Sequence, residues 1–264
     1  MKYCCLSIAG FDGSGGAGIQ ADLKTFSALG CYGMTVLTTL PIQNTTGVKS
    51  CYPLSASCVL DQLETLFEDI RPSGIKIGML GGPEVVTAVA EFLKKQASGI
   101  PIVLDPVMSA KNAATLLTAE GVEALRSQLM PYVTLLTPNV PEAECLAQQT
   151  GLMSDLARKI QAMGPKAVLI KGGHADGPYC DDVLCDQDGE LYWIEGERVD
   201  SRNTHGTGCT LSAAIVAYLA RGDPLLSACC QAKRYLSGAL WAAKDMTLGK
   251  GCGPLNHFFN GVSP

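Results

Sequence analysis

The segment HGTGC, residues 205–209, directly precedes a long run of small and apolar residues. A helix beginning there would direct the free backbone N–H groups of Gly206, Thr207, Gly208 and Cys209 at whatever lies beyond it, and its dipole would favour negative charge. The same field lowers the pKa of a cysteine thiol. The segment therefore predicts an anion site with a reactive thiol, and the alternative is a buried, inert cysteine, as most unpaired cysteines are.

Polar side chains also follow three other apolar runs. Lys171, in LIKGG, leaves an apolar strand where a solvated lysine would be out of place, which favours a counter-charge for a ligand. In TPNVPEAE, Asn139 could bind a phosphate or a metal-bound water and Glu142 could hold Mg²⁺, while a helix N-cap with an acidic first turn is the alternative. Asp105, in LDPV, could face a phosphate or its metal, or simply form a turn.

The most glycine-rich stretch is GFDGSGGAGIQAD, which has five glycines between Gly10 and Gly18. Its spacing matches neither the GxxxxGK[ST] phosphate loop nor the GxGxxG dinucleotide fingerprint. Glycines at this density let a backbone approach a ligand closely, although a tight strand-to-helix turn would also use them. Asp22 would lie on the following helix, where a solvated carboxylate is the ordinary expectation.

Short apolar, β-branched runs alternate with longer helical patterns along most of the chain. This alternation predicts a mostly parallel, doubly wound sheet between two layers of helices, a three-layer α/β sandwich. The segment DDVLCDQDGELYWIEGERV predicts an antiparallel hairpin at a sheet edge, and residues 206–244 predict two helices, the second capped by Asp223. Because ligands of such sheets bind beyond the carboxyl ends of the strands, we expect the polar residues above to share one site.

Composition narrows the function classes. A chain of 264 residues with 47% hydrophobic content is expected to form one domain, residues 1–264. A net charge of -5 without any basic run argues against nucleic-acid binding, and the lack of a long apolar stretch argues against a membrane span. Twelve cysteines with no C-x-x-C pair indicate reduced thiols in the cytoplasm, mostly small core residues, including the pairs Cys4-Cys5 and Cys229-Cys230.

Seven segments in order resemble one family. They are AGFDGSGGAGIQADLKTFSALG, QNTTGV, KIGML, LDPVM, TPNVPEAE, LIKGGH and NTHGTGCTLSAAI. Together they resemble the hydroxymethylpyrimidine and phosphomethylpyrimidine kinases of thiamine biosynthesis, which belong to the ribokinase-like superfamily. The resemblance implies transfer of the γ-phosphoryl group of ATP, with Mg²⁺, to 4-amino-5-hydroxymethyl-2-methylpyrimidine and to its monophosphate.

The resemblance also implies roles for individual residues. Cys209 would be the catalytic base, assisted by Gly206, Gly208 and Lys171. Gln43 would hydrogen-bond the aminopyrimidine edge, in a pocket walled by Gly10, Ala17, Asp22, Met79 and Val107. The nucleotide would be bound by Asn139, Lys171, Thr207 and Asp105, and its metal by Glu142.

Two departures from the family pattern bear on these expectations. Phe11 and Gly13 stand where the family opening G-S-D-P-S-G-G-A-G has serine and proline, which could alter packing on the substrate side. The expected mobile flap after LDPVM reads Ala110-Lys111-Asn112-Ala113-Ala114, without the usual glycine and acid. The alternative functions are a pyridoxine or pyridoxal kinase and a nucleotide- or vitamer-binding module without turnover. A homodimer is compatible with each of these functions.

Overall fold

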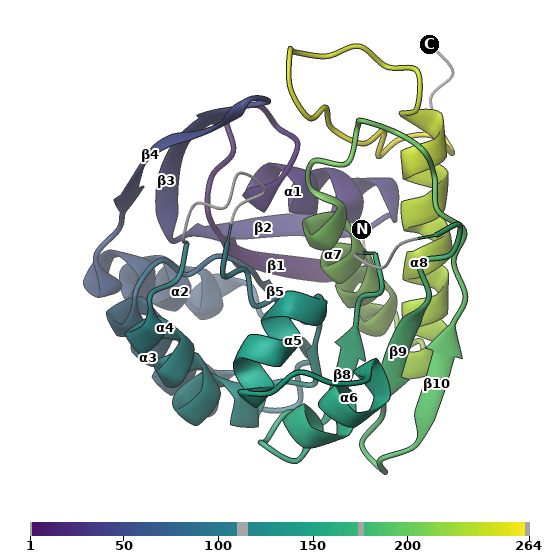
Figure 1. The fold of residues 1–264 in the computed structure, drawn as a ribbon. Helices are drawn as coiled ribbons and strands as arrows, with labels where there is room; N and C mark the ends of the chain where they lie inside the picture. Colours follow the sequence, from purple (N-terminus) through teal and green to yellow (C-terminus); the bar gives the residue numbers. More distant parts are fainter. Residues whose placement is uncertain (1, 110–115, 174–176, 262–264) are drawn as a thin grey trace.

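The computed structural model describes residues 2–109, 116–173 and 177–261. Its main sheet has eight strands in the order β10-β9-β8-β7-β6-β5-β1-β2 (Figure 1). Strands β2, β1, β5, β6, β7 and β8 pair in parallel, while β9 is antiparallel to both of its neighbours, β8 and β10. The predicted mostly parallel sheet is therefore confirmed, and so is the antiparallel hairpin at its edge.

The strands of this sheet follow the predicted apolar runs. They are β1 Cys4–Ala9, β2 Tyr32–Leu37, β5 Gly74–Ile77, β6 Ile102–Leu104, β7 Leu135–Leu136, β8 Ala167–Ile170, β9 Asp182–Cys185 and β10 Leu191–Ile194. The central strands are buried on both faces, which explains why their sequences read as nearly continuous apolar runs.

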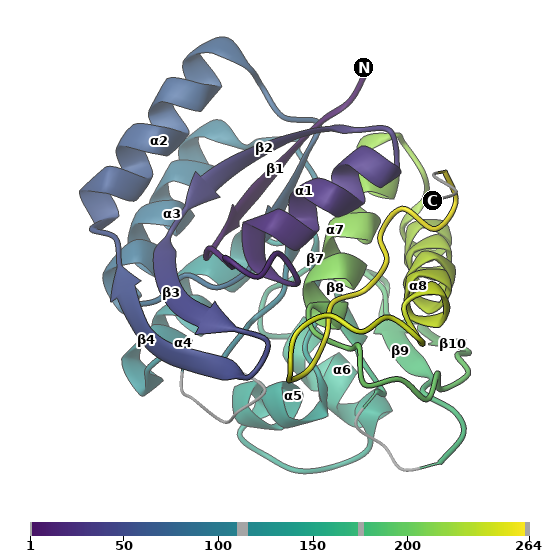
Figure 2. The ribbon, with the colours of Figure 1, turned by 90° about the horizontal axis from the view of Figure 1, so that it is seen from above.

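Helices cover both faces of the sheet, as Figure 2 shows. One face carries α2 Ala56–Asp69, α3 Pro83–Gln96, α4 Ala119–Ala124, α5 Val140–Ala147 and α6 Met153–Gln161. The other carries α1 Gly18–Ala28, α7 Thr207–Ala220 and α8 Leu225–Ala242. Between α4 and β7 the chain continues as a π-helical turn, Leu125–Leu129, and a 3₁₀ turn, Met130–Tyr132. The three-layer arrangement agrees with the prediction.

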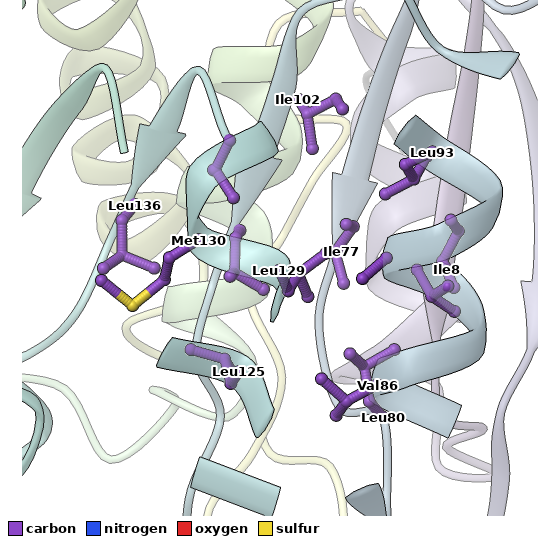
Figure 3. Packing of buried hydrophobic residues seen from close by; sticks show 14 of the residues in the cluster. Ile8, Ile77, Leu80, Val86, Leu93, Ile102, Leu125, Leu129, Met130 and Leu136 are labelled. Atoms are coloured by element: carbon purple, nitrogen blue, oxygen red, sulfur yellow. The ribbon is translucent and has the colours of Figure 1, made fainter. Parts of the chain in front are cut away.

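Each face of the sheet has its own apolar core. On the α3 side, Ile8 and Ile77 of the sheet pack against Val86 and Leu93 of α3, close to Leu129 (Figure 3). On the other face, α7 is almost entirely apolar or small and packs on β5, where a Cβ at Gly74 would lie 3.0 Å from Val216 Cγ1. These two cores hold the strand ends that form the site.

The strand order reverses beside β1. From β1 the chain passes through α1 to β2 on one side, and from β2 it crosses back to β5 on the other side. The carboxyl ends of β1 and β5 therefore flank a topological switch point, the position at which ligands bind in open α/β sheets. Gly10 follows β1 there, and Met79 follows β5.

Two expectations about the elements were wrong or incomplete. No pattern in the sequence indicated a second hairpin, β3 Thr39–Asn44 and β4 Gly47–Pro53, which forms a separate two-stranded sheet directly after β2. Asp223 does not cap α8, because the N-cap position is Pro224. The predicted flap, Ala110 to Ala114, lies outside the described residues.

The cysteines are also less buried than predicted. All twelve lie in the described part of the chain and are thiols, but only four of them are buried. Cys4 and Cys230 are partly exposed, and Cys51, Cys58 and Cys145 are exposed. The expectation that most of them are core residues was therefore wrong. In the described ranges, no helix is both long and apolar enough to cross a membrane.

Candidate active site

A cavity of about 580 Å³ lies at the switch point. Its walls come from the ends of β1 and β5, the hairpin β3–β4, the start of α7, and the C-terminal residues 250–252. The last of these meets the hairpin turn, where Cys252 N donates to Thr45 O at 2.9 Å, and Figure 2 shows the two segments side by side. This volume is within the range of small-molecule binding pockets.

The glycine-rich loop and the start of α7 are packed together at this cavity. Gly206 is the N-cap of α7 with φ +86, and a Cβ there would collide with Gly16 O. Gly18 begins α1 with φ +58, and a Cβ there would collide with Gly10 O. Glycine is required at both positions because each combines a left-handed conformation with a backbone contact. The glycines therefore bring two helix N-termini close together.

Asp12 organises this loop. Its fully buried carboxylate accepts hydrogen bonds from the backbone N–H groups of Ser14, Gly16 and Ala17, and from His205 Nε2 at 2.8 Å. Burial alone would raise the pKa of Asp12, but the bonds from His205, Ser14 and Ala17 outweigh it and hold that pKa far below its usual range. Asp12 is therefore a carboxylate at neutral pH and fixes the shape of the loop.

Most of the expected pyrimidine-binding residues lie together. Gly10, Ala17, Gln43, Met79 and Val107 all line the cavity, and so does Cys209. Gln43 comes from hairpin β3–β4, and its Nε2 donates to Phe11 O at 3.2 Å. The amide is therefore held on the cavity wall by the glycine-rich loop.

Asp22 does not form part of this wall. Its side chain is completely buried beneath the cavity, where Oδ2 accepts from Lys76 Nζ at 2.8 Å and from Ser7 Oγ. Asp22 is therefore absent from the cavity wall where it was expected, and the alternative of a solvated helix carboxylate is wrong. The helical spacing placed Asp22 on α1, but it does not reveal that this face of α1 packs on the sheet.

Phe11 and Gly13, the two departures from the family pattern, are in contact with each other. Phe11 lines the cavity, and a Cβ at Gly13 would lie 3.3 Å from Phe11 Cε1. The small residue at position 13 leaves room for the ring at position 11.

The expected nucleotide-binding residues form a second group beside the cavity. Lys171 Nζ pairs with Asp105 Oδ1 at 2.6 Å and lies 4.0 Å from Glu142 Oε2. Burial lowers the pKa of Lys171, but the two carboxylates outweigh it and leave the pKa above its ordinary value. Lys171, which was predicted at the end of an apolar strand, therefore has two carboxylate neighbours and remains charged.

This group adjoins the start of α7. A Cβ at Gly208 would lie 3.1 Å from Asp105 Oδ2 and 3.4 Å from Lys171 Nζ. Gly208 is next to Cys209, which faces the cavity, so Cys209 lies where the two groups of residues meet. Thr207 is the first helical residue of α7 and directly precedes Gly208.

Asn139 and Glu142 form a complete capping box at the start of α5. Asn139 Oδ1 accepts from Glu142 N at 2.9 Å, and Glu142 Oε2 accepts from Asn139 N at 2.8 Å. The prediction of a helix N-cap with an acidic first turn is thus confirmed. It is compatible with the prediction that Glu142 holds a metal, because Glu142 also faces Lys171. Burial, which Lys171 opposes, raises the pKa of Glu142.

The electrostatics of Cys209 differ from the expectation. We expected the helix N-terminus to lower the pKa of this thiol, but burial raises it, and the opposing charge of Lys76 does not overcome the burial. Asp22 and Asp105 raise it further, while a backbone N–H of Gly18 lowers it. The sequence reveals the helix N-terminus at Cys209, whereas the depth of the thiol depends on the packing of α7 against α1 and β5.

Sequence reasoning missed three site residues, which are Asp12, His205 and Lys76. Lys76 carried a signal, because it stands in the apolar strand GIKI much as Lys171 follows AVLI. Asp12 was the one carboxylate inside the glycine-rich loop, where backbone N–H groups need an acceptor. His205 carried no signal of its own, because its partner is 193 residues away.

The fold and this site define a class of protein. A doubly wound sheet with a hairpin over its switch point, and with glycine-rich loops at two helix N-termini, is the architecture of the ribokinase-like kinases. A family model described as phosphomethylpyrimidine kinase matches residues 12–256. The chain belongs to the phosphomethylpyrimidine kinase family.

Individual relatives are consistent with this membership. The chain is 47% identical to a hydroxymethylpyrimidine/phosphomethylpyrimidine kinase of Salmonella typhimurium and 44% identical to one of Rhizobium meliloti, in each case over 98% of both chains. A phosphomethylpyrimidine kinase structure from Clostridium difficile has a TM-score of 0.79 at 41% identity, over 89% of this chain and 98% of that one.

Pyridoxal kinases have similar structures. An ADP complex of Bacillus subtilis pyridoxal kinase has a TM-score of 0.87 at 35% identity, over 97% of this chain and 98% of that one. A Staphylococcus aureus pyridoxal kinase in complex with AMP-PCP and pyridoxal has a TM-score of 0.87 at 33% identity, over 98% and 94% of the chains. The sequence identity is thus higher with the pyrimidine kinases, while the backbone is similar to both.

Proposed function

We propose that this protein transfers the γ-phosphoryl group of ATP to 4-amino-5-hydroxymethyl-2-methylpyrimidine and then to its monophosphate, in thiamine biosynthesis. Membership of the phosphomethylpyrimidine kinase family supports the reaction. The observation that carries the proposal is the position of Cys209. It lies between the cavity that Gln43 lines and the charged residues Lys171, Asp105 and Glu142. One site would thus hold an aminopyrimidine and a phosphate donor side by side.

In this proposal, Gln43 recognises the ring. Its Nε2 is held by Phe11 O, and its carboxamide can pair with the exocyclic amine and a ring nitrogen of an aminopyrimidine. The apolar parts of Met79 and Val107 supply contact area for the ring. The ring would then lie with its hydroxymethyl group toward Cys209.

The phosphate donor would lie along the start of α7 and beside Lys171. Backbone N–H groups of Gly206, Thr207 and Gly208 can bind phosphoryl oxygens, and Lys171 adds a positive charge. Asp105 and Asn139 belong to this side, because Asp105 holds Lys171 and Asn139 holds the start of α5 beside it. These residues would orient the γ-phosphoryl group toward the cavity.

The residues fit a metal that arrives with the nucleotide. No three His, Cys, Asp or Glu side chains in the described segments form a cluster that could hold an ion. Mg²⁺, however, commonly takes one or two carboxylates and completes its shell with phosphates and water. Glu142 would hold it, and the metal would neutralise charge on the transferring group.

Cys209 would take the proton from the substrate hydroxyl. Its thiolate accepts that proton at Sγ as the oxygen bonds to the γ-phosphorus, and ADP leaves. Since phosphoryl transfer has a loose transition state, positioning and charge neutralisation supply most of the rate, and the base supplies a smaller part.

The test is ATP turnover with the hydroxymethylpyrimidine and its monophosphate as separate substrates, with products identified by mass spectrometry. We expect ADP and the corresponding mono- and diphosphate, at rates that fall in Gln43→Ala and Cys209→Ala. Binding of ATP and the pyrimidine without any turnover would instead support a binding module.

A pyridoxal kinase activity is the second candidate, because the backbone resembles the two pyridoxal kinases as well. A substrate panel separates the two activities. Phosphorylation of pyridoxal with a kcat/KM above that of the hydroxymethylpyrimidine would contradict the first assignment. A single domain, a cytoplasmic location and a homodimer stay predictions from the sequence.

A further inference from the structure

We propose that Lys76 is the cation that stabilises the thiolate of Cys209, and that Asp22 is the positioning residue that holds Lys76 there. The proposal deepens the proposed kinase function and rests on its assignment of Cys209 as the proton acceptor. Neither Lys76 nor the contact between Lys76 and Asp22 is needed to bind the pyrimidine or the nucleotide in that assignment.

The first observation is a shared cavity. Lys76 and Cys209 line the same cavity although they come from different elements, β5 and α7. The two elements are packed tightly, since a Cβ at Gly74 of β5 would lie 3.0 Å from Val216 Cγ1 of α7. The packing of this strand against this helix thus brings the ammonium and the thiol to the same cavity.

The second observation is the environment of the Lys76 ammonium. The side chain has no solvent exposure, and Nζ lies 2.7 Å from the point where a Cβ at Gly78 would be. The absence of a side chain at Gly78 therefore leaves room for the lysine to turn along the end of β5. A buried ammonium must be neutralised or paired, because burial strongly disfavours its charge.

Asp22 provides that pairing. Its Oδ2 accepts from Lys76 Nζ at 2.8 Å and from Ser7 Oγ, and both carboxylate and ammonium are fully buried. Burial lowers the pKa of Lys76, but the negative charges of Asp22, Cys209 and Asp105 together outweigh it, so the pKa lies above its ordinary value. Lys76 therefore stays charged across the working pH range, which is what a thiolate partner requires.

The third observation is the balance of charges around Cys209. Lys76 on β5 opposes the rise in the pKa of the thiol that burial causes, and Gly18 N–H at the start of α1 adds to this. Asp22 on α1 and Asp105 after β6 act in the opposite direction. Among the described residues, His205 and Lys250 are the other basic side chains that line the cavity, and Lys171 after β8 also interacts electrostatically with Cys209. Without Lys76, the pKa of the Cys209 thiol would rise further, and less thiolate would be present to accept the substrate proton.

The test measures the pKa of Cys209 directly. The ligand-free protein is alkylated with iodoacetamide over the neutral and alkaline range, and the rate is followed by mass spectrometry of the peptide containing Cys209. We expect Lys76→Met to raise the pKa of Cys209 by about one unit or more, the usual effect of losing a nearby opposite charge. The acidic limb of the pH profile of kcat should move to higher pH with it, and KM for MgATP should change little.

Lys233→Met is the matched control. Lys233 is also buried and paired with a carboxylate, Asp182, at 2.8 Å, but it does not line the cavity. Its loss should leave the alkylation pKa of Cys209 unchanged. An equal shift in both variants would mean general loosening of the fold and would overturn the proposal, as would an unshifted Cys209 in folded Lys76→Met.

A double variant covers the case in which Lys76→Met fails to fold. Lys76→Met combined with Asp22→Asn leaves no buried charge unpaired, and the carboxamide oxygen introduced on α1 can still accept from Ser7 Oγ. Because Lys76 affects the thiol more strongly than Asp22 does, the pKa of Cys209 should still lie above that of the parent. A pKa equal to or below the parent's would overturn the proposal. The alkylation readout needs no turnover, so its result is separate from whether the protein proves to be a pyrimidine kinase.

Discussion

Asp12 and His205 are joined by a hydrogen bond of 2.8 Å that links the glycine-rich loop after β1 to the segment that begins α7. The two residues are 193 positions apart in the chain; His205 lines the cavity, and Asp12 is fully buried. The bond fixes two helix N-termini, those of α1 and α7, against each other. Both of the proposed binding regions depend on that arrangement.

Removing the charge of Asp12 should therefore affect stability and binding together. Asp12→Asn loses charge-assisted bonds to the loop and to His205, and we expect the free energy of unfolding to fall by about 1.5–3 kcal/mol. Urea denaturation measures this, and KM for the pyrimidine should rise. Asp61→Asn, at an exposed position on α2, is the control. Equal stability of the two variants would show that Asp12 does not organise the loop.

Gln43→Ala should weaken pyrimidine binding. The variant leaves the amine and ring nitrogen of the substrate without partners, at a cost of about 1–3 kcal/mol. Calorimetric titration of the pyrimidine measures the loss, while KM for ATP should hardly change. Gln128→Ala, exposed and distant in sequence, is the control. An unchanged affinity in Gln43→Ala would remove this residue from the site.

Cys209→Ala should lower kcat by about 10²–10⁴, the usual contribution of a general base, with a small change in KM. Cys209→Asp should recover part of the rate, because a carboxylate can accept the same proton. Steady-state kinetics across the pH range make the comparison, with Cys145→Ala, an exposed cysteine on α5, as control. A parental rate in Cys209→Ala at every pH would make the thiol structural.

Lys171→Met and Glu142→Gln should reduce kcat/KM for MgATP while pyrimidine binding stays intact. Glutamine keeps an acceptor for Asn139 N, so Glu142→Gln removes the charge and preserves the cap of α5. Lys166→Met, exposed just before β8, is the control for the lysine. Full turnover by both variants at saturating Mg²⁺ would exclude these two residues from the phosphate side.

His257 should make the protein less stable in mild acid. Burial, with a smaller effect of Lys24, lowers the pKa of His257 from 6.5 to about 4. The unfolded chain therefore binds a proton that the folded protein excludes, so this stability is present above pH 6.5 and is lost as the pH falls toward 4. The loss from this residue should be about 2 kcal/mol between about pH 7 and pH 5. In His257→Gln, which can still bond to Thr210, urea denaturation should show a smaller fall; an equal fall would contradict the assignment.

Much of the fold could be predicted from local patterns. Runs such as GIKI and AVLI are apolar because the strands they form are covered on both faces, and the same burial makes a lysine within or beside them conspicuous. That reasoning found Lys171 and applies equally to Lys76, which was overlooked. The glycines of the two loops were also visible, since only glycine tolerates their conformations and contacts.

The remaining features depend on pairs of residues that are distant in the chain. Nothing near Asp22 indicates that its helix face is buried against Lys76, which is 54 residues away, and nothing near Asp12 indicates His205. The strands of hairpin β3–β4 pair with each other and their residues line the cavity, which the sequence of the hairpin alone does not show. The pKa of Cys209 is the clearest case: the helix N-terminus that lowers it can be read along the chain, but the burial that outweighs it exists only once α1, α7 and β5 have packed together.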